Sequence, residues 1–289
     1  KGGTGKTSIA ASLAFLAHDV VLVDCDVDAA DMHLLVEHKI ISENDFKGGK
    51  IAILNNENCT SCGKCVELCK NYQQGEAVIK ALDHVTLDIE PASFICLSGP
   101  SGSGKTTLLN MIGGLDELDS GEISINGQRV DTLGKGPLAD LRLHHIGFVF
   151  QAYNLIPVLS ARENVEFVMQ VQGVPAAERR RKSSAILEEV GLEGMEDRRP
   201  AQLSGGQQQR VAVARAIVSQ PKLVLADEPT ANLDSRSAQH LMELFQALNE
   251  THGVTFLIST HDERVMRYAK RLVKMQDGRI IEDSEQVPV

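Results

Sequence analysis

Residues 99–107 read Gly-Pro-Ser-Gly-Ser-Gly-Lys-Thr-Thr, and this stretch decides the fold of most of the chain. An apolar, β-prone run at residues 94–98 precedes it, while Leu108, Leu109 and Ile112 follow at helical spacing. The pattern predicts a phosphate-binding loop between a buried strand and a helix. In such a loop, glycines let backbone N–H groups converge on phosphate oxygens, and the helix N-terminus adds partial positive charge.

Two side chains of the loop suit a nucleotide with a bound cation. Lys105 can reach the β- and γ-phosphates, and the hydroxyl of Thr106 can ligate Mg²⁺. An ordinary Gly/Ser turn is the alternative, but a strand before the loop and a helix after it favour phosphate binding.

Composition sets the limits for other functions. The chain has 289 residues, 43% of them hydrophobic, which suffices for one large or two ordinary domains. The formal net charge of -10 argues against bulk binding to nucleic acid or anionic lipid. We expect neither a secretory leader nor a membrane span, because no apolar run in the sequence has the required length. Any membrane would then be supplied by a partner.

A pair of carboxylates follows an apolar run further along the chain. Residues 223–226 are Leu-Val-Leu-Ala, as in a central parallel strand, and Asp227 and Glu228 stand at its end. One carboxylate can hold Mg²⁺, and the next can polarise water for in-line displacement at a γ-phosphate. A second apolar run, residues 254–258, leads to His261, which we interpret as a γ-phosphate contact, with a structural role as the alternative.

A second helix start is suited to anions. Residues 203–210 read Leu-Ser-Gly-Gly-Gln-Gln-Gln-Arg and open a helical pattern that continues through Val211, Ala214 and Ile217. Ser204 stands at the N-cap position, and the glycines after it expose backbone donors.

The remaining elements follow from periodicity and turn residues. We expect a strand-rich region over residues 79–98, hairpins over 121–127 and 271–281, a strand over 146–150 that ends at Gln151, and helices over 161–171 and 176–190.

Taken in order, these motifs resemble those of the ABC-transporter ATPases. The matching positions are the Walker A motif at 99–107, the Q-loop at Gln151, the signature at 203–207, the Walker B motif at 223–228, the D-loop at 231–234 and the H-loop at His261. The match runs from about residue 69 to 289, and its details are most similar to the lipoprotein-release (LolD-like) and macrolide-export (MacB-like) branch. The resemblance implies an α/β P-loop NTPase fold with an antiparallel β subdomain and a helical subdomain at about 152–203.

The resemblance also implies the cofactors, ATP and Mg²⁺, and the residues that bind the nucleotide. Those residues are Tyr72, Gly99, Pro100, Ser101, Gly102, Ser103, Gly104, Lys105, Thr106, Thr107, Gln151, Ser204, Gly205, Gly206, Gln207 and Asp234. Two copies would pair head to tail, with each ATP between the Walker A motif of one copy and the signature of the other. Tyr72 would stack on adenine, and Asp234 would communicate across the dimer.

Catalysis is implied to rest on Glu228 as general base, Lys105 as phosphate clamp and His261 as γ-phosphate sensor. Thr106, Gln151 and Asp227 would hold Mg²⁺. The resemblance therefore implies an ATPase that works as a homodimer. It would act on an integral-membrane permease from the cytoplasmic face of the cell membrane, and it would not bind nucleic acid. The sequence departs from the family at Ala92-Ser93, where Gly-Glu is common, and this puts one turn in doubt.

The first residues carry another phosphate-loop candidate. Residues 1–7, Lys-Gly-Gly-Thr-Gly-Lys-Thr, precede a helical pattern and an apolar run, 20–23, that ends at Asp24 and Asp26. They resemble the deviant Walker A motif of MinD-type ATPases. Because residues 1–58 are short for a fold that needs a whole parallel sheet, we expect little independent nucleotide binding there.

Four of the six cysteines, Cys59, Cys62, Cys65 and Cys69, have the spacing of a bacterial-type iron–sulfur motif. Their crowding suits metal or cluster ligation in a reducing compartment better than a disulfide framework. Lys70 stands where that motif has proline, and no second motif is found to supply the usual cross-ligation. A [4Fe–4S] cluster, a labile site, adventitious zinc and free thiols all remain open.

Two interpretations compete at the junction. A ferredoxin needs a helical turn at residues 65–69, whereas the second domain needs Val66 and Leu68 on one face of a strand before Tyr72. We interpret the chain as a composite of a partial MinD-like fragment (1–58), a cysteine motif and junction (59–69) and an ABC ATPase domain (70–289). The alternatives are an iron–sulfur ATPase or redox protein, a non-transport ABC protein with a cytosolic partner, and a chimera without function as a unit.

Overall fold

The computed structural model describes residues 67–74, 77–125 and 127–287. The predictions made for residues 1–66, which include the N-terminal phosphate-loop candidate with Asp24 and Asp26 and the cysteines Cys59, Cys62 and Cys65, lie outside the described residues.

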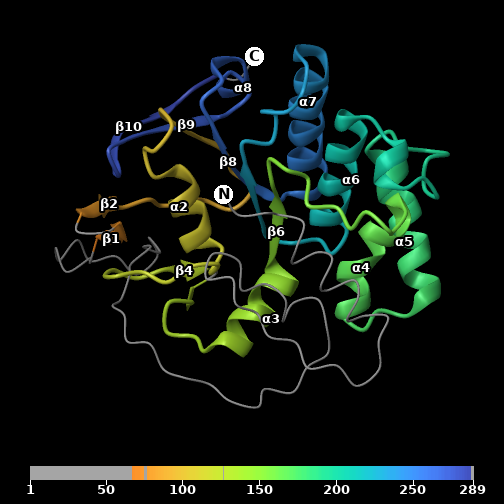
Figure 1. The fold of residues 1–289 in the computed structure, drawn as a ribbon, viewed down its shortest axis with the longest axis horizontal. Helices are drawn as coiled ribbons and strands as arrows, with labels where there is room; N and C mark the ends of the chain where they lie inside the picture. Colours follow the sequence, from red (N-terminus) through yellow and green to blue (C-terminus); the bar gives the residue numbers. More distant parts are fainter. Residues whose placement is uncertain (1–66, 75–76, 126, 288–289) are drawn as a thin grey trace.

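A six-stranded sheet with the order β10-β9-β3-β8-β7-β6 forms the frame of the molecule (Figure 1). Its strands are β3 (Phe94–Ser98), β6 (Ile146–Val149), β7 (Leu223–Asp227), β8 (Thr255–Thr260), β9 (Arg271–Gln276) and β10 (Arg279–Glu285). Strands β9, β3, β8, β7 and β6 run parallel, and β10 adds an antiparallel edge through the predicted hairpin. The uninterrupted apolar runs of the sequence are thus the central parallel strands, and the predicted α/β class is confirmed.

Helices cover both faces of this sheet, which is why its central strands are apolar at successive positions. On β3, Phe94 and Cys96 join one hydrophobic core, while Ile95 and Leu97 join the other. The helices are α2 (Lys105–Ile112), α3 (Lys135–His145), α4 (Ala161–Val171), α5 (Ala176–Glu189), the short 3-10 helix η3 (Pro200–Gln202), α6 (Gly205–Ile217), α7 (Ser235–His252) and α8 (Glu263–Met266). Residues of α4, α5, α6 and α7 line the first core, and residues of α2 and α3 line the second.

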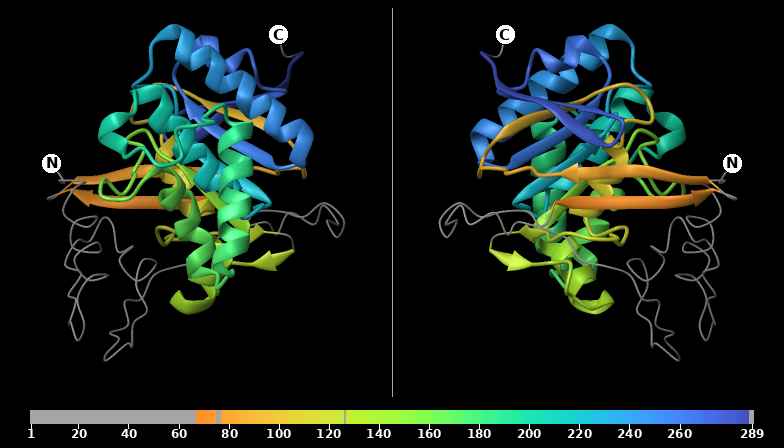
Figure 2. Two further views of the ribbon diagram at one scale, coloured as in Figure 1. Left: turned by 90° about the vertical axis from the view of Figure 1, so that its right-hand side faces the viewer. Right: turned by 90° about the vertical axis from the view of Figure 1, so that its left-hand side faces the viewer.

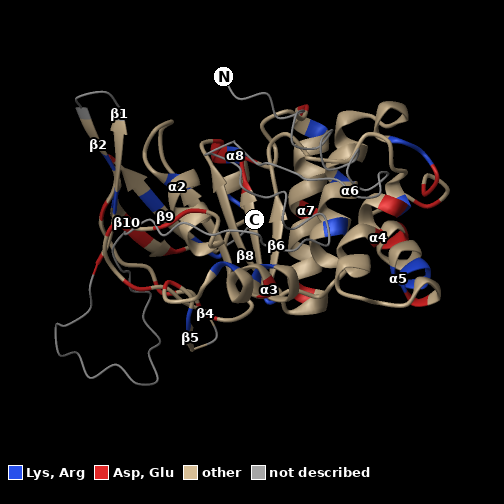
Figure 3. Ribbon diagram, turned by 60° about the horizontal axis from the view of Figure 1, so that its bottom comes forward, with Lys and Arg blue, Asp and Glu red and all other residues tan. Residues whose placement is uncertain are grey.

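The helical subdomain lies between β6 and α6. Helix α4 begins at a capping box in which Ser160 and Glu163 bond reciprocally, and α5 packs against it. Both helices lie where the periodicity predicts them. Helix α5 carries a basic run, residues 179–182, at the side of the molecule opposite β1 and β2 (Figure 3). Among the described helices, none combines the length and apolar character that a bilayer crossing requires.

Two small hairpins complete the β subdomain. Strands β1 (Leu68–Gln74) and β2 (Ala77–Val85) form an antiparallel ribbon that projects from the molecule (Figure 2), and β4 (Ser124–Ile125) pairs with β5 (Gln128–Arg129). Strand β2 ends at Val85, short of the alternation that continues to Ile89 in the sequence. Leu87 is buried all the same, so the alternation beyond Val85 reflects packing on the core rather than strand pairing.

The last two residues of the predicted junction, Leu68 and Cys69, form the start of a strand. Leu68 begins β1 and is fully buried, and the N–H of Cys69 donates to the carbonyl of Ser120 at 3.0 Å. The helical turn that a ferredoxin needs is therefore wrong for Leu68 and Cys69, because their backbone is engaged in β1 and in the bridge to Ser120.

The unusual turn before β3 holds Ala92 in the left-handed region, with φ of 57°. Two nearly buried polar side chains fix it: the N–H of Ala92 donates to Oγ1 of Thr255, and Asn249 Nδ2 donates to the Ala92 carbonyl, both at 2.9 Å. The departure from the family at Ala92-Ser93 therefore leaves the turn in place and adds only local strain. An L-residue in this conformation lowers the stability of the fold by about 1 kcal/mol or more.

We expect Ala92→Gly to raise the free energy of unfolding by about 1 kcal/mol, because glycine adopts the turn without strain. The midpoint of urea unfolding measures this change. The matched control is Ala185→Gly at an exposed interior position of α5, which should lower stability by about 1 kcal/mol. An Ala92→Gly protein that is no more stable than its parent contradicts the strain assigned to this turn.

Candidate functional site

The loop between β3 and α2 is fixed by close backbone contacts at two glycines. A Cβ on Gly99 would lie 2.2 Å from the Met275 carbonyl oxygen, and one on Gly104 would lie 2.3 Å from that of Ala81. Both glycines also have positive φ, of 149° and 98°. The loop is therefore held between β9 and β2 in a shape that only glycine permits at these positions.

The start of α2 is open to an anion. Gly104 is its N-cap and provides no side-chain hydrogen bond, so the backbone N–H groups of the first turn remain available to phosphate oxygens. Lys105 is nearly buried, and its Nζ donates to the carbonyls of Gly99 and Pro100 at 2.8 and 2.9 Å, directly over the loop. Buried Ser103 has a hydroxyl without a hydrogen-bond partner in the described part of the chain. These donors fit a chain of phosphate groups.

A hydroxyl and a carboxylate meet beside this loop. Thr106 Oγ1 donates to Asp227 at 3.1 Å from Oδ1 and 3.0 Å from Oδ2. The contact forms because β3, β8 and β7 are neighbours, so their carboxyl ends meet at one edge of the sheet. Oxygen ligands of this kind suit Mg²⁺.

Sequence reasoning missed Ser259, which contacts the carboxylate of Asp227 and the backbone of Glu228. Its hydroxyl donates to Asp227 Oδ1 and accepts from the backbone N–H of Glu228 at 3.1 Å. The signal in the sequence is a serine at the end of an otherwise apolar run; its pairing with Asp227 depends on the β7–β8 register.

Glu228 lies just beyond β7 and faces His261, which follows β8. Glu228 Oε1 is 2.9 Å from Nδ1 of His261, and the Glu228 side chain is 17% exposed, so it is accessible to water from one side. The backbone of Glu228 is left-handed, with φ of 45°, and its N–H also donates to the Ser259 carbonyl at 3.1 Å. Strained backbone of this kind persists where neighbouring groups over-determine it, and it is common at functional sites.

The predicted Q-loop and D-loop are joined to each other. Gln151 follows β6, next to β7, and its carbonyl accepts a hydrogen bond from Asn232 Nδ2 at 2.9 Å. Asp234 caps α7 by accepting from the N–H groups of Arg236 and Ser237, each at 3.0 Å. Hydrogen bonding from Ser237 lowers the pKa of Asp234, which is therefore ionised at neutral pH.

The predicted signature forms the start of α6. Ser204 Oγ accepts from Gln207 N–H at 3.3 Å, and Gln207 Oε1 accepts from Ser204 N–H at 2.9 Å, which makes a complete capping box. Gly205 and Gly206 leave the helix start bare of side chains. Within the described residues, no hydrogen bond or ion pair joins residues 204–207 to the loop at 99–107, so one chain does not bring the two anion-binding helix starts into contact.

Tyr72 lies on β1 near the start of α2. Its hydroxyl donates to Asp116 Oδ2 at 2.6 Å, and Lys70 Nζ lies 5.0 Å from the ring centroid. Burial and the hydrogen bond to Asp116 raise the pKa of Tyr72, while a hydrogen bond with Thr107 acts in the opposite direction. Tyr72 as a residue is 38% exposed.

Comparison with known proteins places this geometry in one family. The family model described as ABC transporter matches residues 82–231. An uncharacterized ABC transporter ATP-binding protein of Thermotoga maritima is 46% identical over 215 residues, a match that covers 74% of this chain and 92% of that protein. The macrolide export ATP-binding/permease protein MacB of Brucella melitensis is 44% identical over 218 residues, which are 75% of this chain and 34% of MacB. The chain thus spans about a third of the length of MacB.

A solved structure has the same fold. It is the dimeric, post-hydrolysis state of the ATP-binding cassette MJ0796 bound to ADP and Pi, with 40% sequence identity and a TM-score of 0.72. The match covers 78% of this chain and 100% of that chain. The predicted P-loop NTPase fold with its β and helical subdomains is therefore confirmed.

We expect Ser204→Ala to lower the free energy of unfolding by about 1 kcal/mol without nucleotide, because the capping box of α6 is lost. Ser160→Ala, which removes the equivalent box of α4, should cost a similar amount. Chemical denaturation of both variants tests this expectation, and an unchanged midpoint for Ser204→Ala would contradict it.

Proposed function

The chain belongs to the ABC transporter family, and we propose that it is an ATP-binding, ATP-hydrolysing subunit that powers a membrane permease through ATP-driven pairing of two copies. The observation that carries the proposal is the convergence of Thr106, Asp227, Glu228 and His261 at the edge of the sheet beside the glycine loop. The sequence predicts an ATPase domain at residues 70–289. Because β1 begins at Leu68, we propose that the domain also includes Leu68 and Cys69.

The glycine loop would hold the triphosphate. Backbone N–H groups at the start of α2 and the hydroxyl of Ser103 donate to phosphate oxygens, and Lys105 exchanges its loop carbonyls for the β- and γ-phosphates. Mg²⁺, when bound, offsets negative charge on the phosphates, and Thr106, Asp227 and Gln151 are the residues proposed to hold it. Tyr72 would support adenine from β1.

Glu228 is the proposed general base. Its carboxylate accepts a proton from the water that attacks the γ-phosphorus, the bond from that phosphorus to the bridging oxygen breaks, and ADP leaves. Nδ1 of His261 contacts Oε1 of Glu228 from one side, and with a proton on both ring nitrogens the imidazole can also donate to the γ-phosphate through Nε2. Ser259 is a positioning residue, since it acts through Asp227 and Glu228.

One chain would supply only half of this site. The start of α6 is a bare, capped helix N-terminus without a contact to the glycine loop of its own chain among the described residues. We assign it to the ATP held by a second copy, where Ser204, Gly205 and Gly206 face the γ-phosphate. The dimeric state of the solved relative supports this arrangement. A Cβ on Gly205 would lie 4.0 Å from the Asn232 carbonyl oxygen, and Asp234 accepts a hydrogen bond from Ser237, which lies against Gly206. We propose that Asn232 and Asp234 link the two nucleotide sites of the dimer.

The partner proposed is an integral-membrane permease, engaged from the cytoplasmic face of the membrane. The similarity to MacB, whose name describes macrolide export and an ATP-binding/permease protein, favours export or lipoprotein release as the process. The match covers about a third of MacB. The proposal that a complete transporter exports its substrate is therefore supported by this similarity, and not by the residues that the structure describes.

Separately, we propose that the residues before this domain are a MinD-type fragment whose Cys59, Cys62 and Cys65 take an iron–sulfur cluster with Cys69 or an outside ligand. The strand position of Cys69 favours the outside ligand. Anaerobic iron and sulfide analysis after reconstitution tests it, and metal near zero removes it.

We expect Glu228→Gln to lower ATP turnover by a factor of about 100 or more, because the general base is lost, and to favour an ATP-bound dimer. The matched control is Lys6→Ala in the N-terminal loop candidate, which should change turnover little. Steady-state phosphate release measures both. Retained turnover in the first variant, or a large loss in the second, contradicts the assignment of the site.

We also expect Ser204→Ala, introduced into the Glu228→Gln chain, to abolish the ATP-dependent dimer. Ser160→Ala in the same chain should keep it, although both changes remove a capping box. Size-exclusion chromatography with ATP and Mg²⁺ reports the difference. A dimer that survives Ser204→Ala refutes the role of α6 in the second chain.

A further inference from the structure

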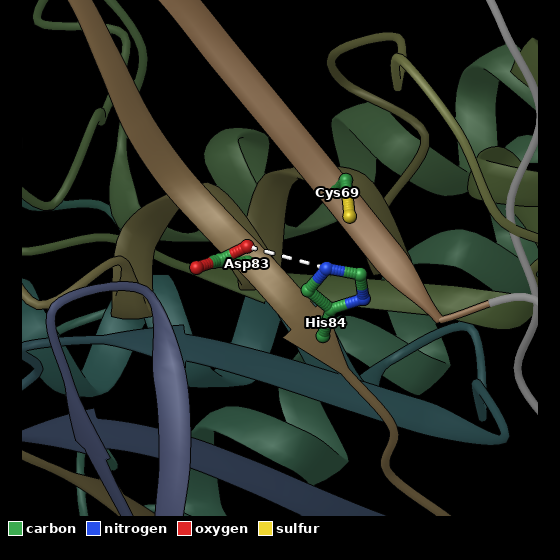
Figure 4. Close-up of side chains that lie close together, drawn as sticks. All are labelled: Cys69, Asp83 and His84. Carbon is green, nitrogen blue, oxygen red and sulfur yellow. Dashed lines mark ion pairs between the residues drawn. The ribbon is translucent and has the colours of Figure 1, made fainter.

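Three side chains of the β1–β2 hairpin gather outside the phosphate site. The ligand atoms of Cys69, Asp83 and His84 all lie within 4.8 Å of one another (Figure 4). We propose that these residues form a binding site for a divalent transition-metal cation, with Zn²⁺ as the best match.

A β-bulge creates this cluster. Leu68 pairs with Val85 and Lys70 pairs with Leu82, so Cys69 stands opposite two residues, Asp83 and His84. Consecutive residues of a regular strand point to opposite faces. Here the register shift and the left-handed backbone of His84, with φ of 57°, bring both side chains next to Cys69.

His84 is oriented for ligation by a neighbouring carboxylate. Its Nδ1 is 2.5 Å from Oε2 of Glu67, and its Nε2 is 3.6 Å from Oδ1 of Asp83. A carboxylate accepts hydrogen bonds, so the contact with Glu67 assigns the proton of His84 to Nδ1, which donates it in the hydrogen bond. The lone pair of Nε2 is then left on the side of Asp83 and Cys69. Metal-binding histidines are held in this way by a carboxylate on the other ring nitrogen.

Asp83 is likewise held with one oxygen turned to the cluster. Its Oδ2 accepts from Nε and Nη2 of Arg279 on β10 at 2.9 and 2.7 Å, which leaves Oδ1 toward His84. Lys80 Nζ lies 3.6 Å from the same Oδ1, but its side chain is 64% exposed and can turn to solvent when a cation enters.

The donor set selects the ion. Sulfur, imidazole nitrogen and carboxylate oxygen together suit Zn²⁺, whereas the oxygen ligands at Thr106 and Asp227 suit Mg²⁺. Three protein ligands leave a fourth position for water. The Cys69 thiol gives its proton to solvent as the sulfur–metal bond forms. A cation can reach the cluster from solvent, because the side chain of His84 is 61% exposed.

A bound ion would fasten β1 to β2 three residues before Tyr72. The site would therefore order the strand that carries the proposed adenine contact. The inference does not depend on ATP hydrolysis and can be tested without nucleotide.

The test uses Co²⁺ as a spectroscopic probe in the full chain with Cys25, Cys59, Cys62 and Cys65 all replaced by Ser, so that the upstream cysteines cannot contribute. We expect one equivalent of Co²⁺ to bind with a thiolate-to-cobalt absorption band, and one equivalent of Zn²⁺ to displace it. In this chain, Cys69→Ser should remove the band, and His84→Gln should weaken Co²⁺ binding at least about tenfold.

Two further variants keep the test decisive. Glu67→Gln changes an exposed residue and should weaken binding by about tenfold while the band remains, because it alters only the orientation of His84. Cys96→Ser is the cysteine control: burial raises the pKa of the Cys96 thiol to about 12, and the band should survive its loss. Absence of the band in the parent chain, or a band that survives Cys69→Ser, overturns the proposal.

Discussion

The close approach of two glycines to backbone carbonyls is the constraint on which the rest of the site depends. Gly99 lies against Met275 of β9, and Gly104 lies against Ala81 of β2, with no room for a Cβ at either contact. The shape of the phosphate loop therefore depends on β9, which is far from it in sequence, and on β2, which precedes β3. Because β2 belongs to the projecting hairpin, the hairpin supports the loop as well as Tyr72.

The second level of organisation is the shared edge of parallel strands. Strands β3, β8 and β7 are adjacent, so the residues that follow them gather at one place. The register that sets Asp227 beside Ser259 lets one hydroxyl hold the Asp227 carboxylate and the backbone of Glu228. Glu228 departs from strand geometry at this point and turns its carboxylate toward His261. The chemistry thus follows from strand order and one polar residue within an apolar strand.

Much of this was predictable because the deciding signals are local. Long apolar runs gave the central strands, helical spacing gave α4, α5 and α6, and Ser204 marked the start of α6. Ser259, the Asn249 and Thr255 contacts that support Ala92, and the bulge opposite Cys69 were not predicted, since each depends on which strands or helices become neighbours. At Cys69, local spacing suggested a ligand set shared with Cys59, Cys62 and Cys65 or completed by an outside ligand. Pairing in β1 sets Cys69 beside Asp83 and His84, and spacing along the chain cannot show that neighbourhood.

The central claim is that one chain carries half of a catalytic site. The most direct test measures the ATP hydrolysis rate per chain over a wide range of chain concentrations, with the dimer fraction determined by sedimentation at each concentration. The account predicts a rate per chain that rises with concentration in step with the dimer fraction and then levels off. A rate per chain that stays constant at dilutions where sedimentation finds only monomer would contradict it.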